Sequence, residues 1–273
     1  MKFSDLKIAK ETRKNIIAFC PYHKDSNTPN LYIIKRGAMA GFYKCFACGA
    51  KGYMDLPKKY EMKKEKRSKP VDINWFGLVL DYLSGGLNLG YPGDLFYKGS
   101  SRDFMIGWDI YTNCYTIPMR NEYREIIGIQ RRFLDNSKCS VEGSKLGLFI
   151  KELGNVFSNC QQVIITEGLS DCVVATKNYG FAAIGRPSCN SCEGMVENYL
   201  NINCSNCKEV VIITDNDNPG IRGAKSLADR LKKKYQVKII APPIGIKDLR
   251  MWKDNGLTKE KLDKIIEKTN VWI

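Results

Sequence analysis

The chain has 273 residues, the length of about two domains, and it is 44% hydrophobic and 26% charged. This composition supports a sizeable core and excludes an intrinsically disordered protein. The net charge is +14, and residues 1–70 hold 17 of the 43 lysines and arginines but 6 of the 29 acids, so we expect a polyanionic partner for the front of the molecule.

Residue counts exclude several other classes of protein. No apolar run approaches the ~20 residues of a membrane span, and residues 1–15 lack the apolar stretch of a secretion signal. We therefore expect a cytoplasmic protein without a membrane partner, in which the eleven cysteines are metal ligands or free thiols. The single histidine, His23, excludes Ser-His-Asp chemistry and multi-histidine metal sites unless it takes part itself.

Residues 1–56 contain a pattern typical of a zinc ribbon. Two pairs of ligand residues, each with a two-residue spacer, are separated by 21 residues: Cys20, His23, Cys45 and Cys48. Such spacers let each pair bind one ion from a turn. The intervening segment predicts a β-hairpin. A unit of this size has too little core to fold alone, so we expect one structural zinc.

Basic and aromatic residues alternate along the same block. The basic residues are Lys24, Lys35, Arg36, Lys44 and Lys51, and the aromatic residues are Tyr32, Phe42, Tyr43 and Phe46. Cations neutralise phosphates, and aromatic faces stack on unpaired bases. The ribbon as a whole is therefore predicted to contact single-stranded nucleic acid. For any one of the aromatics, a place in the core of the ribbon is an equally good interpretation.

The middle of the chain shows a change of pattern. Residues 57–70 form a basic linker, either flexible or a short exposed helix. Within residues 71–160, helical spacing predicts a helix over 72–83, followed by a glycine-rich loop over 84–93. Short β-like runs follow at 115–119, 126–132 and 146–150.

Residues 161–250 alternate between strands and helices. Apolar β-branched runs at 163–166, 181–185, 210–214 and 237–242 are separated by helical stretches at 170–178, 193–200 and 220–235. This alternation predicts a parallel sheet covered by helices, within a chain of α/β class that is α+β overall. The tail, 251–273, predicts one short amphipathic helix.

Acidic residues follow successive strands of this predicted sheet, namely Glu167, Asp171, Asp215, Asp217 and Asp248. The carboxyl ends of parallel strands meet at one edge, where ligands bind. Carboxylates gathered there repel one another unless a cation lies between them, and oxygen ligands suit magnesium or manganese. Two such ions would promote phosphoryl transfer. Asp171 and Asp217 could instead serve as helix caps.

The segments EGLSD (167–171), DNDNPGIRGA (215–224) and KDL (247–249) resemble the Toprim signature of primases, topoisomerases and related nucleases. The front segment CPYHKDSNTPNLYI, with FYKCFACGAKG, resembles the ribbon of DnaG-type bacterial and bacteriophage primases. The segment IPMRNEYREIIGIQRRFLDNSKCSVEGSKLGLF more loosely resembles the basic primase segment that precedes Toprim. The order of the three indicates a DnaG-type primase.

This resemblance implies a nucleotidyltransferase, a DNA-directed RNA polymerase that makes RNA primers on single-stranded DNA from ribonucleoside triphosphates in a bacterial or phage-infected cell. It implies that Glu167, Asp215 and Asp217 hold magnesium or manganese, with Asp171 and Asp248 as supporting acids. Arg132 and Lys138 would contact nucleotide phosphates or the template. About 25 residues follow Asp248, fewer than the helicase-binding domain usual in the family. Either coupling to a helicase is absent or weak, or the sequence is part of a longer chain, and a separate replicative helicase is one expected partner.

The inventory of cations agrees with this chemistry. Phosphoryl transfer needs metals and cations but no histidine or cysteine nucleophile. The cations of the middle block that could supply nucleotide or template contacts are Arg120, Arg131, Arg132, Lys138 and Lys145. A single one of these residues would more often be a solvated surface charge, whereas a cluster facing the acids would form a binding surface.

Two other functions remain open. A recombination mediator that pairs a zinc motif with Toprim would bind DNA without polymerising nucleotides, and a Toprim nuclease would cleave it. The mediator would not need Asp215 and Asp217 as metal ligands or the basic middle block. The nuclease would give no reason for a primase-type ribbon.

A second cysteine set has a zinc-like spacing, with Cys189, Cys192, Cys204 and Cys207. The predicted helix 193–200 separates its two pairs. Eight helical residues span ~12 Å, too far for ligands that share one ion. We therefore favour free thiols, with Cys160 near Cys204 or Cys207 at the opposite edge of the sheet from Cys189.

Overall fold

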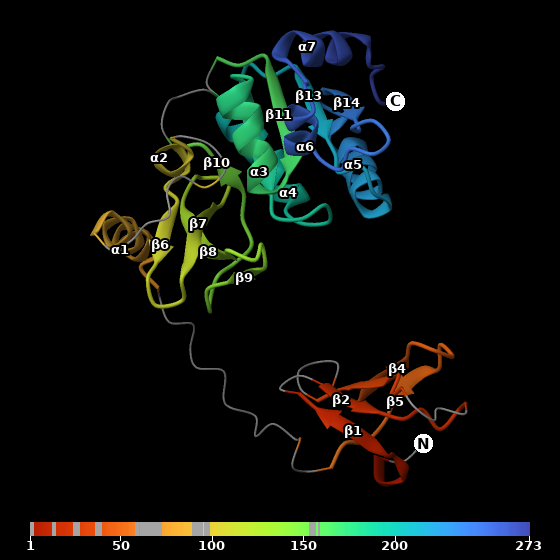
Figure 1. Ribbon diagram of the computed structural model, residues 1–273. Coiled ribbons are helices and arrows are strands. Elements are labelled where there is room, and N and C mark those ends of the chain that lie inside the picture. The colour runs from red at the N-terminus through yellow and green to blue at the C-terminus, as the bar shows by residue number, and fades with distance from the viewer. Residues whose placement is uncertain are drawn as a thin grey trace. The chain divides into compact units, whose positions relative to one another are not determined.

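The computed structural model describes residues 3–12, 15–23, 28–35, 40–57, 60, 73–88, 95, 99–152, 157 and 159–273 (Figure 1). The chain divides into two compact units, Met1–Val71 and Asp72–Ile273. The predicted linker 57–70 lies almost entirely outside the described residues. The predicted fold class is confirmed, since an antiparallel ribbon sheet precedes a mixed α/β unit.

The first unit is a five-stranded antiparallel sheet in the order β1-β2-β3-β4-β5. A short 3-10 helix precedes strands β1 (Ile8–Glu11), β2 (Asn15–Ala18), β3 (Leu31–Ile34), β4 (Phe42–Cys45) and β5 (Lys51–Tyr53). Alternate residues of β2, β3 and β4 face a small core that includes Ile16, Leu31 and Tyr43. The predicted hairpin is confirmed as β3 and β4, whereas β1, β2 and β5 were not predicted.

The second unit begins with a four-stranded antiparallel sheet in the order β6-β7-β8-β9. Its elements are α1 (Trp75–Asn88), α2 (Ser100–Phe104), β6 (Gly107–Asp109), β7 (Cys114–Arg120), β8 (Ile126–Phe133) and β9 (Lys138–Ser140). Strands β7 and β8 match their predicted positions. Helix α1 packs so closely on β6 that a Cβ atom on Gly107 would lie 2.7 Å from the Cβ of Tyr82.

The predicted bounds of α1 were wrong at both ends. The Asn74 side chain accepts a hydrogen bond from the Gly77 N–H at 2.9 Å, so the helix begins after this cap rather than at residue 72. The helix then continues through residues 84–88, where a glycine-rich loop was predicted. Each interior glycine costs roughly 0.5–1 kcal/mol relative to alanine, a cost that packing against the sheet offsets. Residues 89–93 of the predicted loop lie outside the described residues.

The remainder of the unit forms a five-stranded sheet in the order β10-β12-β11-β13-β14. Its strands are β10 (Phe149–Ile150), β11 (Gln162–Glu167), β12 (Ala182–Arg186), β13 (Glu209–Ile213) and β14 (Gln236–Ile240). All neighbours are parallel except β10, which runs antiparallel to β12. The predicted parallel sheet is therefore confirmed.

Helices cover both faces of this sheet (Figure 1). On one face lie α3 (Gly168–Val173), its π-helical continuation (Val174–Asn178), α6 (Leu249–Asp254) and α7 (Lys259–Lys268). On the other face lie α4 (Glu193–Asn203) and α5 (Asn218–Leu231). Alternate residues of each strand point to opposite faces, so a strand that is covered by helices on both sides is apolar along most of its length.

The two sheets of the second unit are joined by residues 148–150. Leu148 pairs with Arg120 of β7 through two backbone hydrogen bonds of 2.9 and 2.7 Å. The next two residues form β10 and pair with Gly185 and Ile184 of β12. Consistent with this connection, residues of β6 and β7 share one hydrophobic core with residues of the parallel sheet.

The tail differs from the predicted single helix. Helix α6 ends at Asp254, Gly256 adopts a φ of +88°, and Thr258 caps a separate helix, α7. Because this left-handed backbone favours glycine, Gly256 provides the break between the two helices. No helix in the described ranges is long and apolar enough to span a bilayer.

Candidate functional site

The carboxyl edge of the parallel sheet collects all five predicted acids. Glu167 ends β11, Asp171 lies in the first turn of α3, and Asp215 and Asp217 follow β13. Asp248 caps α6, which packs against α3. The charges of Glu167, Asp248 and Asp217 all act on Asp215, so the structure brings these side chains together.

Burial and mutual repulsion make two of these acids weak. Burial, followed by the charge of Glu167, raises the pKa of Asp215 to about 7. Burial, followed by the charges of Asp248 and Asp215, raises the pKa of Asp171 to about 8. A hydrogen bond from the Arg250 N–H to Asp171 opposes this rise. Uncompensated carboxylates of this kind favour a nearby cation.

Several of these acids also hold the local backbone. Asp217 accepts a hydrogen bond from the Gly220 N–H at 2.7 Å and caps α5. Asp248 accepts one from the Met251 N–H at 2.7 Å and caps α6. Glu167 accepts one from the Cys189 N–H at 3.2 Å. Each carboxylate retains a second oxygen, so capping and metal binding are compatible functions.

The acidic cluster fits a divalent cation by donor chemistry, because magnesium and manganese prefer carboxylate oxygens. The acids are nevertheless less closely grouped than the ribbon ligands. Over the part of the chain that the structure describes, only the ribbon group has three or more ligand atoms that all lie within 4.8 Å of one another.

Two of the predicted cations face this cluster. Arg132 of β8 and Lys138 of β9 are cross-strand partners on the same face of the antiparallel sheet. Burial, followed by the charge of Arg132, lowers the pKa of Lys138, and the charges of Asp215 and Asp171 oppose this change. Lys247 and Arg250 were not predicted as site residues, although both flank Asp248 in the sequence and act on the acids.

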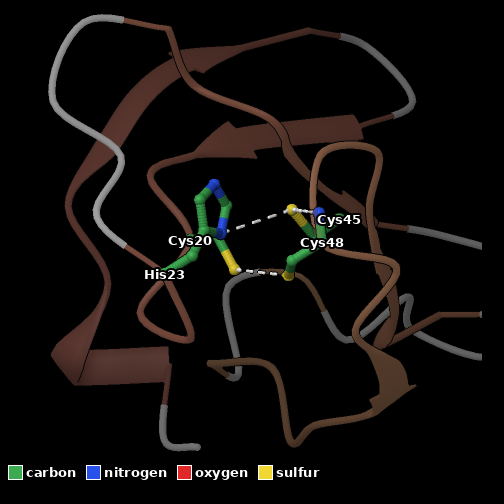
Figure 2. A group of neighbouring side chains, drawn as sticks. All are labelled: Cys20, His23, Cys45 and Cys48. Atoms are coloured by element: carbon green, nitrogen blue, oxygen red, sulfur yellow. Dashed lines mark hydrogen bonds between the residues drawn. The ribbon is translucent and has the colours of Figure 1, made fainter.

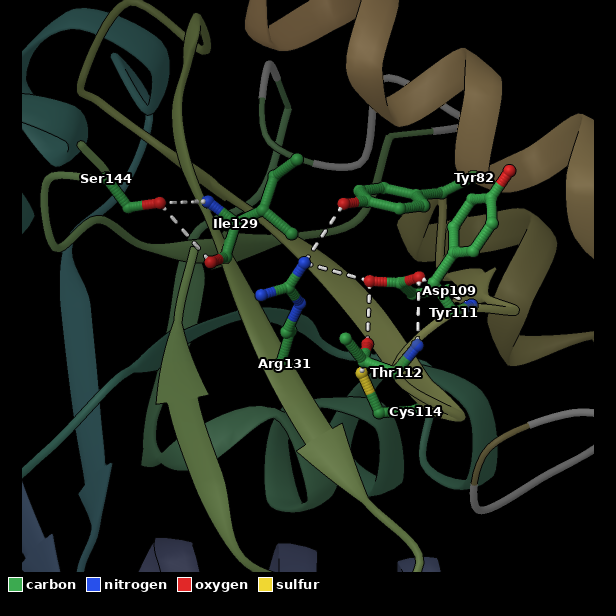
Figure 3. Close-up of polar contacts among 8 residues, drawn as sticks. All are labelled: Tyr82, Asp109, Tyr111, Thr112, Cys114, Ile129, Arg131 and Ser144. Atoms are coloured by element: carbon green, nitrogen blue, oxygen red, sulfur yellow. Dashed lines mark hydrogen bonds and ion pairs between the residues drawn. The ribbon is translucent and has the colours of Figure 1, made fainter. Parts of the chain in front are cut away.

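The other predicted cations are not brought to the acids. Arg131 points to the opposite face of the sheet, where its Nη2 lies 2.8 Å from Asp109 Oδ2 and 3.4 Å from the Tyr82 hydroxyl of α1 (Figure 3). Arg120 is buried and forms an ion pair with Glu152 at 2.9 Å. Lys145 is exposed in the loop before β10. Internal contacts therefore account for Arg120 and Arg131.

Asp109 is the centre of the network around Arg131 (Figure 3). It accepts hydrogen bonds from the N–H groups of Tyr111 and Thr112 and from the Thr112 hydroxyl. Burial alone would raise the pKa of Asp109, but these bonds and the Arg131 charge outweigh it and lower the pKa. The network fastens β6 and β8 to α1.

We expect Arg131→Ala to destabilise the second unit by ~3–5 kcal/mol, because it leaves a buried carboxylate without its cation. The Asp109 side chain is 3% exposed. Lys145→Ala, which changes an exposed cation of the same unit, serves as the control, and we expect a change within about 0.5 kcal/mol. Urea unfolding measures both. Equal stability of the two variants would contradict a structural role for Arg131.

The raised pKa values predict the pH dependence of the metal-free chain. Because the folded-state pKa values of Asp215 and Asp171 lie above the ~3.9 of an unfolded aspartate, the folded state binds these protons more tightly. The free energy of unfolding should therefore fall as the pH rises from about 4 to about 8. Thermal unfolding at several pH values tests this. Asp171→Asn should flatten the fall, and an unchanged slope in this variant would show that Asp171 does not cause it.

The ribbon ligands form a compact group in the first unit (Figure 2). Cys20 Sγ lies 3.8 Å from Cys48 Sγ, and Cys45 Sγ lies 3.9 Å from His23 Nδ1. Two sulfurs bound to one zinc at about 2.3 Å lie roughly 3.8 Å apart in a tetrahedron, so the spacing fits such an ion.

Backbone geometry supports this group. Gly49 has a φ of +76° and donates its N–H to the Cys45 carbonyl at 3.1 Å, which forms the tight knuckle. Burial alone would raise the pKa of Cys45, but N–H groups of Cys48 and Ala47 outweigh it and lower the pKa. These donors favour the thiolate form that metals bind.

The structure divides the aromatic and basic residues predicted for the ribbon surface. Tyr43 is buried in the core, and Lys35 is buried and paired with Glu11 at 3.0 Å. Tyr32 and Phe46 are exposed and stack edge to face with ring centroids 5.1 Å apart. Lys44 Nζ lies 5.3 Å from the Phe46 ring. Lys24 and Arg36 lie outside the described residues.

The second cysteine set is separated as predicted. Helix α4 lies between the two pairs, with Cys192 at its N-cap and Cys204 at its C-cap. Its 11 residues span ~16 Å. Cys160 lies against Cys204 and Cys207 at the far end, as expected. Burial raises the pKa of all three thiols, which makes them poor nucleophiles.

Both the sequence and the fold are similar to those of known proteins. The Toprim-like family matches residues 164–251. The zinc-binding and RNA polymerase domains of the Aquifex aeolicus primase are 17% identical, with a TM-score of 0.55 over 99% of this chain and 82% of that chain. A comparison with curated protein sequences finds no match.

Two further solved structures are similar. The DnaG primase catalytic domain bound to single-stranded DNA is 12% identical, with a TM-score of 0.53 over 72% of this chain and 78% of that chain. The primase fragment of the bacteriophage T7 primase-helicase is 14% identical, with a TM-score of 0.50 over 91% of this chain and 96% of that chain. Residues 164–251 therefore form a Toprim-like domain, and the chain as a whole has the fold of the DnaG-type primases.

Proposed function

We propose that this chain is a DNA primase, a nucleotidyltransferase that synthesises short RNA primers on single-stranded DNA from ribonucleoside triphosphates. The observation that carries the proposal is the acidic cluster at the carboxyl edge of the parallel sheet, which faces Arg132 and Lys138 on the antiparallel sheet. The likeness in fold to a DnaG domain bound to single-stranded DNA supports this template, and a replicative helicase is proposed as a further partner because one similar fold belongs to a primase-helicase.

The roles of the acids follow from their positions. Glu167, Asp215 and Asp217 would hold magnesium or manganese, which supplies charge stabilisation for the attacking and leaving oxygens of phosphoryl transfer. Asp171 is buried behind them and accepts a hydrogen bond from the Arg250 N–H, so it supports the start of α6. Asp248 caps the same helix and adds negative charge beside Asp215.

The cations serve the phosphates. Arg132 and Lys138 face the acids from β8 and β9, and charged groups in this position would neutralise nucleotide phosphates. Arg131 holds β8 in place from the opposite face, so it acts on binding only through the strand it anchors. Cys20, His23, Cys45 and Cys48 would hold one structural zinc in the ribbon.

One incubation separates the proposed function from its alternatives. Single-stranded template, labelled ribonucleotides and magnesium should yield short, template-dependent RNA. Cleavage of the template would favour a Toprim nuclease, and binding without synthesis or cleavage would favour a recombination mediator. Either of these two results would contradict the proposal.

The ribbon is proposed to stack on template bases through Phe46, which is 65% exposed beside Lys44. We expect Phe46→Ala to weaken binding to single-stranded DNA by ~1–3 kcal/mol, about five-fold or more, because each base–aromatic stack contributes this much. The matched control is Tyr111→Ala in the second unit, where the side chain is 92% exposed. Fluorescence anisotropy measures both. Equal losses in the two variants would show that Phe46 has no special role.

A further inference from the structure

A buried arginine at the carboxyl edge of the parallel sheet has two guanidinium nitrogens without a hydrogen-bond partner among the residues that the structure describes. Arg186 ends β12 and is the in-register neighbour of Glu167 on β11. It is 3% exposed, and neither its Nε nor its Nη1 has a hydrogen-bond partner among the residues that the structure describes. Burial lowers the pKa of Arg186, but a guanidinium stays charged in proteins.

An unpaired buried charge is costly, because burial removes its hydration without replacing it. Such a group in a native structure therefore needs an explanation, and a bound ion is one that supplies the missing partner. The partner of a guanidinium is an anion, and the group most complementary to its planar fork is a carboxylate or a phosphate.

The two carboxylates whose charges act most strongly on Arg186 are engaged by other groups. Glu193 accepts a hydrogen bond from the Ser226 hydroxyl at 3.2 Å and lies 3.9 Å from Arg230 Nε. Glu167 accepts one from the Cys189 N–H at 3.2 Å. Both act on Arg186 at longer range, but neither is a hydrogen-bond partner of its Nε or Nη1. An external anion therefore remains the unmet requirement.

The start of α4 supplies further donors beside this arginine. The charges that act on Arg186 most strongly are Glu193, the first residue of α4, and then Glu167. The N-cap residue, Cys192, has a φ of +61° and gives the helix no side-chain cap. N–H groups in the first turn of a helix have no partner within the helix and attract anions.

We propose that Arg186 and the first turn of α4 bind a phosphate group next to the acidic cluster. The inference rests on the proposed function, which brings two sources of phosphate to this edge: a nucleoside triphosphate and a nucleic-acid strand. The site lies beside Glu167, on the side of β12 and α4, whereas Arg132 and Lys138 approach the acids from the antiparallel sheet. The two sets of cations thus belong to different elements of the second unit.

Isothermal titration calorimetry of the full chain with magnesium tests this site. One arm uses tripolyphosphate, which has no base or sugar, and the other uses an oligothymidylate without terminal phosphates. We expect Arg186→Gln to weaken binding in one arm by about ten-fold or more, since hydrogen bonds to charged groups contribute ~1.5–3 kcal/mol. The arm that weakens identifies the source of the phosphate. The affinity of Arg186→Lys should lie between those of Arg186→Gln and the wild type, because lysine keeps the positive charge but loses the planar fork of donors.

The control is Arg102→Gln, an exposed arginine of α2 in the same unit, for which we expect unchanged binding in both arms. Unchanged binding of both probes by Arg186→Gln would overturn the proposal. A second measurement needs no variant, because bound phosphate should shift the amide resonances of residues 193–195 in the wild type. Amide resonances that stay in place at saturation would also overturn it.

The binding measurement is independent of catalysis. A chain that binds tripolyphosphate through Arg186 but makes no RNA would contradict the proposed function and leave the phosphate site intact. A chain that makes RNA with unchanged phosphate binding in Arg186→Gln would contradict the phosphate site alone.

Discussion

Asp215→Asn should abolish primer synthesis while it leaves the fold and the binding of template intact. The carboxylate lies among Glu167, Asp217 and Asp248, and it is the acid on which most of the cluster acts. An amide oxygen is a much poorer metal ligand than a carboxylate, and phosphoryl transfer depends on positioned metals rather than on a protein nucleophile. We expect a loss of at least about 100-fold in the rate of synthesis, of the size seen when one electrostatic group of an active site is removed.

The same variant should be no less stable than the wild type. Burial and like charges raise the pKa of Asp215 to about 7, so the ionised group destabilises the metal-free fold at neutral pH. Replacement by a neutral amide should raise the melting temperature in the absence of metal. Asp229→Asn, which changes an exposed aspartate at the far end of α5, is the control for activity. Near-normal synthesis by Asp215→Asn would exclude this cluster as the catalytic centre.

Cys45→Ser should release one metal ion per chain and unfold the ribbon. Cys45 is fully buried in the ribbon core, and its Sγ lies 3.9 Å from His23 Nδ1 and accepts the Cys48 N–H at 3.5 Å. The core of this unit is small, so most of its folding free energy should come from the metal, ~10 kcal/mol or more for a structural zinc. Loss of one zinc ligand should therefore lower the folding free energy of the ribbon more than any single substitution in its hydrophobic core.

The second unit should remain folded in this variant, because its cores contain no residue of the ribbon. Metal analysis by mass spectrometry and amide exchange over residues 15–56 measure the two effects. Cys139→Ser, which changes an exposed cysteine of β9, is the control and should leave both unchanged. Two zinc ions in the wild type would contradict the assignment of the second cysteine set as thiols.

The parallel sheet and its acidic edge could be predicted because each rests on a simple regularity. Strands buried on both faces are mostly apolar along their whole length, and four short, mostly apolar runs occur in order. Acids that directly follow these runs must lie at one edge whatever the details of packing. The same regularity predicted the separation of the two cysteine pairs by α4.

The sequence alone could not show which cations face the acids and which form internal contacts. Arg131 and Arg132 are neighbours on β8, so their side chains lie on opposite faces, and only the position of α1 and β9 decides which face meets the acids. Strands β6 and β9 have three residues each, too few for the alternation of apolar and polar residues that indicates a strand. Two missed features could have been predicted from the sequence. Lys247 and Arg250 flank Asp248, which places them near the acidic cluster. Asn255-Gly256 followed by Thr258 is typical of the end of one helix and the start of another, which indicates the break between α6 and α7.

The junction at residues 148–150 has a consequence for how substrate is received. Leu148 is hydrogen-bonded to β7 and the next two residues to β12, so one continuous ladder of backbone bonds joins the strands that carry Arg132 and Lys138 to the strands that carry the acids. The strands that carry these two groups of residues cannot move apart without breaking this ladder. If the acids and these cations act together as proposed, folding already sets their relative placement, and that part of the ordering entropy is not lost again when substrate binds. Under the proposed function, the ordering that remains on binding would be that of the nucleic-acid strand itself.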